Sequence, residues 1–279
     1  MPERLLFITS TRLGDAVLST GVLSRLIADH PGAEITIVCG PLPAPLFRAV
    51  PGLKRIIPIV KRRMTQHWIK LFLDVVPTRW DVFVDLRGVL LLNLVRARTT
   101  YRYHRRAQIR HKVEENAGIL GVPNVEPCLW IDDRARADAD QLLGGARGFL
   151  AIGPTAGNPH KEWAMSRFAE LARTLTSAGG ALAGLPICVF ASAAERVRLV
   201  PFFAASPGRI IDLAGKTDPV AAAACLERAS LYVGNDSGLM HLAAAAGTPT
   251  LGLFGTGNPA IYRPWGPRAA YIERRWPDT

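Results

Sequence analysis

Residues 231–255 read LYVGNDSGLMHLAAAAGTPTLGLFG, and this stretch indicates the fold class more directly than any other part of the chain. A short apolar run ends at Gly234, as expected for a buried strand. Asp236 or Ser237 can cap the helix that follows, and Gly247 suits the position just after its end. A second apolar run follows this glycine. The order strand, helix, strand is typical of a parallel sheet in an α/β protein.

The start of this predicted helix has the chemistry of an anion site. Its first backbone N–H groups have no partner within the helix and can bind an anion. Ser237 and Gly238 precede His241 by four and three positions, so the three residues share one helix face. Open α/β sheets bind ligands at the carboxyl ends of their strands, where this turn lies. Alone, His241 is typical of a core histidine, but its neighbours on the same face favour a ligand-binding role.

Strands separated by helices occur in both halves of the chain, which predicts an α/β protein with two parallel sheets. A loose polar segment with a short charged helix at 133–143 divides the halves. We place the boundary near Arg147 and expect domains at residues 1–147 and 148–279. The expected strands are 5–9, 34–39, 55–60, 81–85 and 101–106 in the first domain, and 149–153, 187–191, 210–213, 231–233 and 250–254 in the second.

Composition excludes several classes of protein. The chain has 279 residues, of which 49% are hydrophobic, enough to bury two cores. Its four cysteines are scattered without a C-x-x-C pair, which disfavours a zinc site or a disulfide framework and fits a reducing compartment. The opening residues lack the pattern of a signal peptide, and the longest apolar run, 89–95, is far too short to span a bilayer. We therefore expect a cytoplasmic protein.

The net charge of +11 is concentrated in the first half, above all in residues 96–112, which contain seven Lys or Arg and no acid. Such a run favours an anionic partner, although a basic stretch is often only a solvated face. Aromatic residues are limited to Tyr101 and Tyr103, so we expect no nucleic acid. An anionic membrane surface or a phosphorylated glycolipid is the favoured partner.

The first domain opens with a strand and the loop STRLGD, residues 10–15, before a single predicted helix. Asp15 has two roles open to it. It can cap that helix through its side chain, or it can act as a general base on a hydroxyl.

The second domain opens with a strand and the loop GPTAGNPHKEW, residues 153–163. Thr155 and the glycines permit close approach of the backbone to phosphate, and Lys161 supplies a charge for a leaving diphosphate. The alternative is a solvent loop with an ordinary surface lysine. The chain has no G-x-G-x-x-G and no G-x-x-x-x-G-K-[ST], which disfavours a dinucleotide dehydrogenase or a P-loop enzyme. No cluster has metal-ligand spacing, so no metal and no cofactor are expected.

Two further strand ends carry titratable residues. Glu195 follows the strand 187–191, where it can hydrogen-bond a ribose, although an acid that complements a helix dipole explains it equally. Asp85 and Arg87 end the strand 81–85, where they can pair with each other or face a ligand.

Three stretches together resemble the heptosyltransferase-like glycosyltransferases, family nine. RLLFITSTRLGDAVLSTGVL (4–23) looks like that family's first strand, loop and helix, and GPTAGNPHKEWAMSRFAELA (153–172) looks like its lysine loop. VGNDSGLMHLAAAAGTPTLGLFGTGNP (233–259) is similar to its most specific motif. The resemblance spans residues 4–265 and implies the GT-B fold, in which two Rossmann-like domains with parallel sheets face a cleft.

The resemblance implies an inverting, metal-independent transfer of a sugar, typically heptose from an ADP-sugar, to a lipopolysaccharide-type acceptor. Asp15 falls at the position of the catalytic base and Lys161 at that of the diphosphate-binding lysine. The positions implied for donor binding are Thr155, Lys161, Glu195, Asp236, Ser237, Gly238 and His241. We expect Arg12 and Arg87 on the acceptor side.

Family members usually continue into a further helical segment after the stretch that resembles residues 233–265. Its absence here keeps one alternative open, a non-catalytic relative that binds nucleotide or glycan. A GT-B-like sugar-nucleotide epimerase is a further alternative. The expected partners are a nucleotide-sugar donor and an anionic glycolipid or glycan acceptor, with peripheral contact with the inner face of the cytoplasmic membrane.

Overall fold

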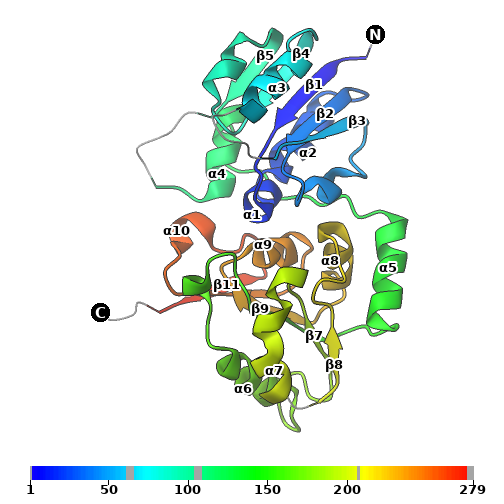
Figure 1. Cartoon of the computed structure of the whole chain (residues 1–279), viewed down its shortest axis with the longest axis vertical. Coiled ribbons are helices and arrows are strands. Elements are labelled where there is room, and N and C mark those ends of the chain that lie inside the picture. The colour runs from blue at the N-terminus through cyan, green and yellow to red at the C-terminus, as the bar shows by residue number, and fades with distance from the viewer. Residues whose placement is uncertain (1, 61–65, 104–108, 206–207, 275–279) are drawn as a thin grey trace. The chain divides into compact units, whose positions relative to one another are not determined.

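The computed structural model describes residues 2–60, 66–103, 109–205 and 208–274 (Figure 1). The chain divides into two compact units, Met1–Trp130 and Ile131–Thr279. This division lies before the boundary predicted near Arg147. Helix α5 (Asp133–Leu143) accounts for the difference, because it packs on α8 (Pro219–Leu226) of the second unit. Arg105 and Arg106 of the predicted basic run lie outside the described residues.

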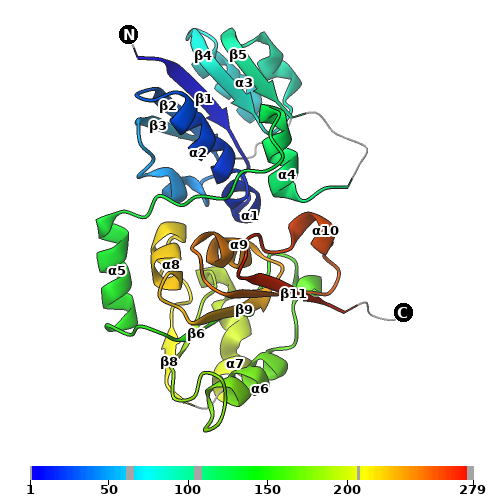
Figure 2. The same cartoon turned by 180° about the vertical axis from the view of Figure 1, so that it is seen from behind.

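The first unit is a five-stranded parallel sheet in the order β3-β2-β1-β4-β5. Its strands are β1 (Arg4–Ile8), β2 (Glu34–Cys39), β3 (Leu53–Pro58), β4 (Trp80–Asp85) and β5 (Ala97–Arg102). Its helices are α1 (Leu13–Val17), α2 (Thr20–Asp29), α3 (Gln66–Val75) and α4 (Lys112–Ala117), with 3-10 turns η1 (Ala44–Phe47), η3 (Leu90–Leu94) and η4 (Gly118–Leu120). Figure 1 shows α3 against one face of this sheet, and Figure 2 shows α2 against the other.

Burial explains the strand order of this sheet. The central strand β1 is almost wholly apolar and buried on both faces, as parallel sheets covered by helices require. The edge strand β5 has no buried residue and is mostly polar. The strand predicted at 101–106 overlaps only the last two residues of β5. The position of β5 depends on its pairing with β4 and not on an apolar pattern of its own.

The single helix predicted after residues 10–15 is two helices. α1 ends at Val17 and α2 begins at Thr20. Between them the Ser19 hydroxyl donates to the Ala16 carbonyl at 2.7 Å, and the Thr20 hydroxyl donates to the Val17 carbonyl at the same distance. Serine and threonine can satisfy backbone groups in this way and so interrupt a helix.

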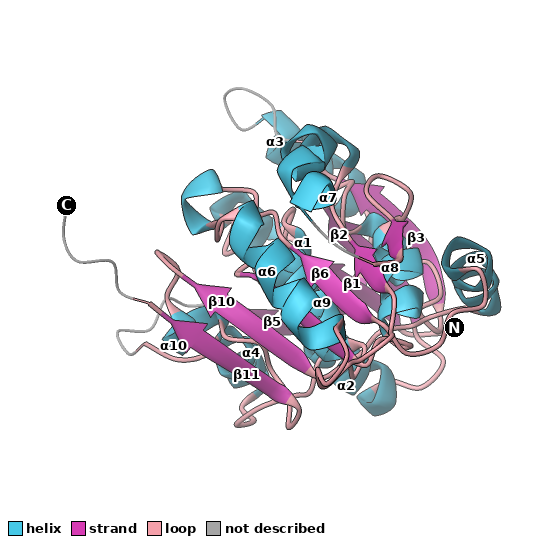
Figure 3. Ribbon diagram, turned by 90° about the horizontal axis from the view of Figure 1, so that it is seen from below, coloured by secondary structure: helices cyan, strands magenta, loops and turns pink. Residues whose placement is uncertain are grey.

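The second unit is a six-stranded parallel sheet in the order β11-β10-β9-β6-β7-β8. Its strands are β6 (Leu150–Gly153), β7 (Ile187–Val189), β8 (Ile210–Asp212), β9 (Leu231–Asn235), β10 (Thr250–Phe254) and β11 (Ala269–Glu273). Besides α5 and α8, its helices are α6 (Met165–Thr176), α7 (Val200–Ala205), α9 (Gly238–Ala245) and α10 (Pro259–Tyr262), with 3-10 turns η5 (Pro159–Lys161) and η6 (Ala193–Leu199). Figure 3 shows α6 lying along the sheet.

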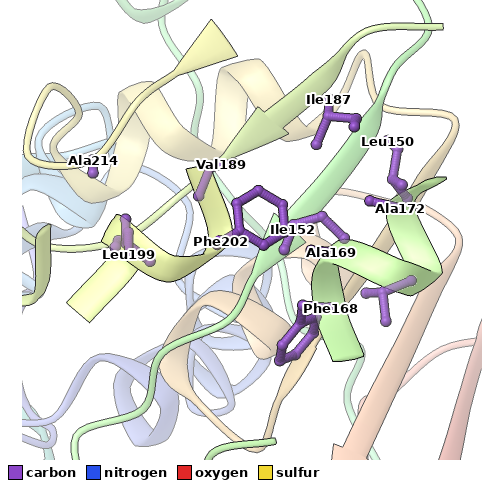
Figure 4. Packing of buried hydrophobic residues seen from close by; sticks show 12 residues of the cluster. Leu150, Ile152, Phe168, Ala169, Ala172, Ile187, Val189, Leu199, Phe202 and Ala214 are labelled. Atoms are coloured by element: carbon purple, nitrogen blue, oxygen red, sulfur yellow. The ribbon is translucent and has the colours of Figure 1, made fainter. Parts of the chain in front are cut away.

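One face of this sheet is covered by α6, η6 and α7. Phe168 of α6 and Phe202 of α7 are fully buried against Ile152 and Val189 of the strands (Figure 4). Each aromatic side chain removes a large apolar area from water, so this layer supplies much of the unit's stability.

On the other face of this sheet, three neighbouring strands each carry a glycine, and the three glycines form a row across the sheet. Gly153 of β6 pairs with Gly234 of β9, which pairs with Gly252 of β10. A Cβ at Gly153 or Gly234 would lie 2.0 or 2.3 Å from the Tyr232 hydroxyl, and one at Gly252 would lie 2.5 Å from the Met240 sulfur. The glycines therefore leave space for the Tyr232 side chain and for α9 to pack directly against this face of the sheet.

No helix within the described ranges is both long and apolar enough to cross a bilayer.

Candidate functional site

In both units the candidate residues lie where the strand order reverses. β6 begins the second sheet, the chain then runs outward to β8, and it returns to β9 on the other side of β6. In the first sheet, β1 and β4 meet in the same way. The carboxyl ends of such neighbouring strands are the usual ligand sites of open α/β sheets. The loop with Lys161 follows β6, and Asp236 follows β9.

Lys161 and Asp236 form an ion pair at this place in the second unit. The Lys161 ammonium donates to Asp236 Oδ2 at 2.5 Å, with side chains 30% and 6% exposed. The pair joins the end of η5 to the turn before α9. An ammonium has three donors, so Lys161 can bind a further oxygen while it keeps this contact. Lys161 is therefore held in place by Asp236, and its role in binding a diphosphate stays a prediction.

The loop that carries Lys161 is fixed by two buried or half-buried neighbours. Asn235 accepts from the Trp163 backbone N–H at 3.0 Å and donates to the Pro154 carbonyl at 2.7 Å, so it holds both ends of the loop. Glu162 accepts from the Ala156 N–H at 2.8 Å and also pairs with Arg198. These positioning residues were missed by sequence reasoning, because their partners are distant in sequence.

Thr155 lies in the same loop and is 2% exposed. Among the described residues its hydroxyl has no hydrogen-bond partner. A buried hydroxyl without a partner costs about 1–3 kcal/mol, so such groups are commonly found where a ligand or water supplies the bond.

Glu195 has both carboxylate oxygens engaged. One accepts from the backbone N–H and hydroxyl of Ser192, at 2.8 and 2.7 Å, and the other pairs with Arg198 at 2.9 Å. This is a capping box at the start of η6. The geometry favours the helix-start alternative, and the ribose contact stays a prediction.

The helix of the opening motif begins as expected, with Ser237 at the N-cap and Gly238 as its first residue. The Ser237 side chain makes no capping bond, so it is not committed to the helix. His241 is 4% exposed, and its ring lies edge-on to Tyr262, with centroids 6.4 Å apart. Three predicted donor residues, Ser237, Gly238 and His241, thus lie at the start of α9, directly after Asp236 in the chain.

Gly257 completes this part of the site and was not singled out from the sequence. A Cβ at Gly257 would lie 2.3 Å from Asp236 Oδ2, so the loop after β10 approaches the carboxylate closely. Only the motif GTGNP after the strand could have indicated it.

In the first unit, Asp15 is not the cap of its helix. α1 begins at Leu13 with Arg12 at the N-cap position, which places Asp15 in the first turn. Its Oδ2 accepts from the Ser10 hydroxyl at 3.3 Å. The capping interpretation is therefore wrong, and most of the hydrogen-bonding capacity of this half-buried carboxylate is left for other partners.

Ser10 links Asp15 to both predicted acceptor-side arginines. Its oxygen accepts from the Arg12 backbone N–H at 3.1 Å and from the Arg87 guanidinium at 3.4 Å. The side chains of Arg12 and Arg87 are exposed. The structure thus brings together the ends of β1 and β4, with one carboxylate and two arginines.

Asp85 has a structural role and does not form an ion pair with Arg87. It is 1% exposed and accepts the backbone N–H groups of Arg87, Gly88 and Val89 at 2.8, 3.0 and 2.9 Å. Burial raises the pKa of this carboxyl, and the three N–H groups oppose the rise. Asp85 therefore shapes the loop that presents Arg87.

The described residues contain no group of three or more His, Cys, Asp or Glu side chains that could hold a metal ion.

Comparison with known proteins identifies the class of this chain. The model of glycosyltransferase family 9 (heptosyltransferase) matches residues 85–277. Lipopolysaccharide heptosyltransferase 3 of Escherichia coli is 25% identical over 292 residues, covering 90% of this chain and 83% of the relative.

Solved structures agree with this match and show the fold. A glycosyl transferase family 9 protein from Veillonella parvula superposes with a TM-score of 0.83 at 21% identity, covering 98% of this chain and 86% of that one. The E. coli ADP-heptose lps heptosyltransferase II superposes with a TM-score of 0.78 at 22% identity, covering 97% and 90%. The GT-B class, two Rossmann-like units with parallel sheets, is confirmed. The chain belongs to glycosyltransferase family 9 and is a glycosyltransferase.

Proposed function

We propose that this glycosyltransferase moves a heptose from ADP-heptose to a lipopolysaccharide-core acceptor. Relatives named as lipopolysaccharide heptosyltransferases support this choice of donor and acceptor. The observation that carries it is the Lys161–Asp236 pair, because it fixes a cation beside the start of α9 at the carboxyl ends of β6 and β9. A diphosphate bound there would meet one ammonium and the free N–H groups of a helix start.

The first unit supplies the proton acceptor in this proposal. Asp15 takes the proton of the acceptor hydroxyl, whose oxygen attacks the anomeric carbon while the bond from that carbon to the diphosphate oxygen breaks. ADP leaves with the bonding electrons, and the sugar is inverted. Ser10 orients Asp15, and Arg12 and Arg87 supply positive charge for an anionic acceptor.

The second unit stabilises the leaving group. Lys161 and the N–H groups at the start of α9 bind the diphosphate, so the step needs no metal and no cofactor in this proposal. Thr155 donates its hydroxyl to a phosphate oxygen. Asp236 positions Lys161. Ser237, Gly238 and His241 line the donor side. Glu195, already held by Ser192 and Arg198, contacts the ribose through a remaining lone pair of its carboxylate.

Asp15→Asn tests the assignment of the base. We expect loss of transfer by about 10²–10⁴-fold, the usual contribution of a general base, with ADP affinity unchanged. The rate is measured as ADP release with ADP-heptose and a core-truncated lipopolysaccharide, and the affinity by calorimetry. Asp29→Asn is the control, because Asp29 forms only an exposed pair with Arg25. A normal rate in Asp15→Asn would remove Asp15 from the mechanism.

A non-catalytic relative would give a different result in the same assay. It would bind ADP tightly and release no product from wild-type protein, whereas the proposed enzyme turns over.

A further inference from the structure

Two neighbouring elements of the first unit expose large apolar side chains. On α3, Ile69 and Leu73 are 50% and 64% exposed, and they lie four positions apart on one side of the helix. On η3, Leu90 and Leu94 are 82% and 65% exposed. α3 and η3 contact each other on the same face of the sheet (Figure 1). The four residues are called the apolar ridge below.

The apolar ridge is distinct from the core beneath it. Leu71 and Val75 of α3 are buried, and so is Leu92 of η3, in one cluster with Phe83 of β4. These residues already anchor both elements to the sheet. The exposed residues are therefore not needed for packing of this unit, and neighbouring exposed apolar side chains of this kind mark interaction surfaces.

The charge around the apolar ridge is positive. Lys70 lies on α3 between Ile69 and Leu73 and is exposed. All charged side chains of residues 86–103 are arginines, and Arg96 and Arg98, just after η3, are exposed. Asp74, the acid of α3, is paired with Arg55 at 3.2 Å. An apolar surface with a basic border fits an anionic bilayer, where side chains enter the interface and cations meet lipid phosphates.

We propose that α3 and η3 form a docking surface for an anionic lipid bilayer, with the apolar ridge inserted in the interface and Lys70, Arg96 and Arg98 on the lipid headgroups. This binding is a property of the first unit and is independent of the transfer reaction. It brings a peripheral enzyme to the surface where lipid-linked acceptors lie.

Vesicle co-sedimentation of the full chain tests the surface. The probes are vesicles of phosphatidylglycerol with phosphatidylethanolamine, and vesicles of phosphatidylcholine alone. We expect wild-type protein to bind the anionic vesicles, and Leu90→Ser with Leu94→Ser to weaken binding at least about tenfold. Arg96→Gln with Arg98→Gln should weaken it by about tenfold and flatten its dependence on salt. The Cys39 thiol, which is buried in the first unit, should stay protected from alkylation in all ridge and arginine variants, which shows that this unit folds.

The matched control is Leu42→Ser with Val197→Ser, which removes exposed apolar side chains, 59% and 75% exposed, from other places in the chain. It should bind vesicles as wild type does. Equal binding by the ridge variant and the wild type would overturn the proposal, as would binding that does not depend on anionic lipid. A wild-type dimer that becomes monomeric in the ridge variant, with vesicle binding unaltered, would assign the ridge to a second copy instead.

Discussion

At the scale of single residues, the position of Lys161 depends on the side chain next to it. Glu162 accepts the Ala156 N–H and pairs with Arg198, which also holds Glu195. Its side chain is only 13% exposed, so solvent weakens these contacts little. Glu162 thus joins the two ends of the loop from Ala156 to Lys161, and this contact holds Lys161 in position.

Glu162→Ala should weaken ADP binding by at least about tenfold, because a lost buried hydrogen bond to a charged group costs roughly 1.5–3 kcal/mol and the loop loosens. Glu162→Gln retains an acceptor for the Ala156 N–H and should lose less. Calorimetric titration with ADP measures both. Glu170→Ala is the control, since its pair with Arg167 is exposed on both sides and of little value. Wild-type affinity in Glu162→Ala would contradict the positioning role.

At the scale of elements, the contact of α9 with its sheet depends on the glycine row. At Gly234 an added Cβ would meet the Tyr232 hydroxyl at 2.3 Å and the Gly153 carbonyl at 2.7 Å. Tyr232 is fully buried, and burial raises the pKa of its phenol. The Tyr232 side chain is fully buried and the Gly153 carbonyl belongs to the backbone of the neighbouring strand, so the motif needs glycine here for packing.

Gly234→Ala should therefore lower the free energy of unfolding by about 1–3 kcal/mol, the usual penalty for overpacking a core. Denaturant titration followed by circular dichroism measures this loss. Gly157→Ala is the control, because a Cβ there would meet no atom within 4 Å. A stability loss in Gly157→Ala as large as in Gly234→Ala would show that chain flexibility, and not packing, explains the effect.

Elements with a clear sequence pattern of their own, whether apolar or charged, were predicted well from sequence. The strand 250–254 and the helix 133–143 agree with β10 and α5 at both ends. β11 was missed, because all but its first residue are exposed and pairing with β10 creates it. The break between α1 and α2 was missed since it depends on two hydroxyl bonds, from Ser19 and Thr20.

In the candidate site, too, features encoded by local sequence differ from those that depend on contacts between distant segments. The predicted helix start at Ser237 agrees with α9, whose N-cap is Ser237 and which contains Gly238 and His241. The contact of Lys161 with Asp236 joins two strand ends, so it depends on β6 and β9 being neighbours. No local pattern encodes that adjacency. Within this site, local sequence patterns indicated the candidate residues, whereas their contacts with one another follow from the order of the strands in the sheet.

At the scale of the whole molecule, each unit has its own core. Phe83 belongs to a cluster made only of first-unit residues, and Phe202 to one made only of second-unit residues. Each unit also contains buried cysteine thiols, whose reactivity shows whether that unit is folded. Burial raises the pKa of Cys39 in the first unit and of Cys225 in the second to about 12, and it raises the pKa of Cys188 in the second as well. Such thiols are unreactive at pH 8 while their unit is folded.

Separate cores predict separate unfolding. Phe202→Ala should cost about 3–5 kcal/mol and increase alkylation of Cys188 and Cys225 about a hundredfold or more, while Cys39 stays protected. Phe83→Ala should do the reverse. Pulsed iodoacetamide labelling with peptide mass spectrometry resolves each thiol in the intact chain, and labelling of the same thiols in denaturant serves as the reference. If either substitution raised labelling at all three buried thiols equally, the two units would unfold as one, which would contradict the prediction.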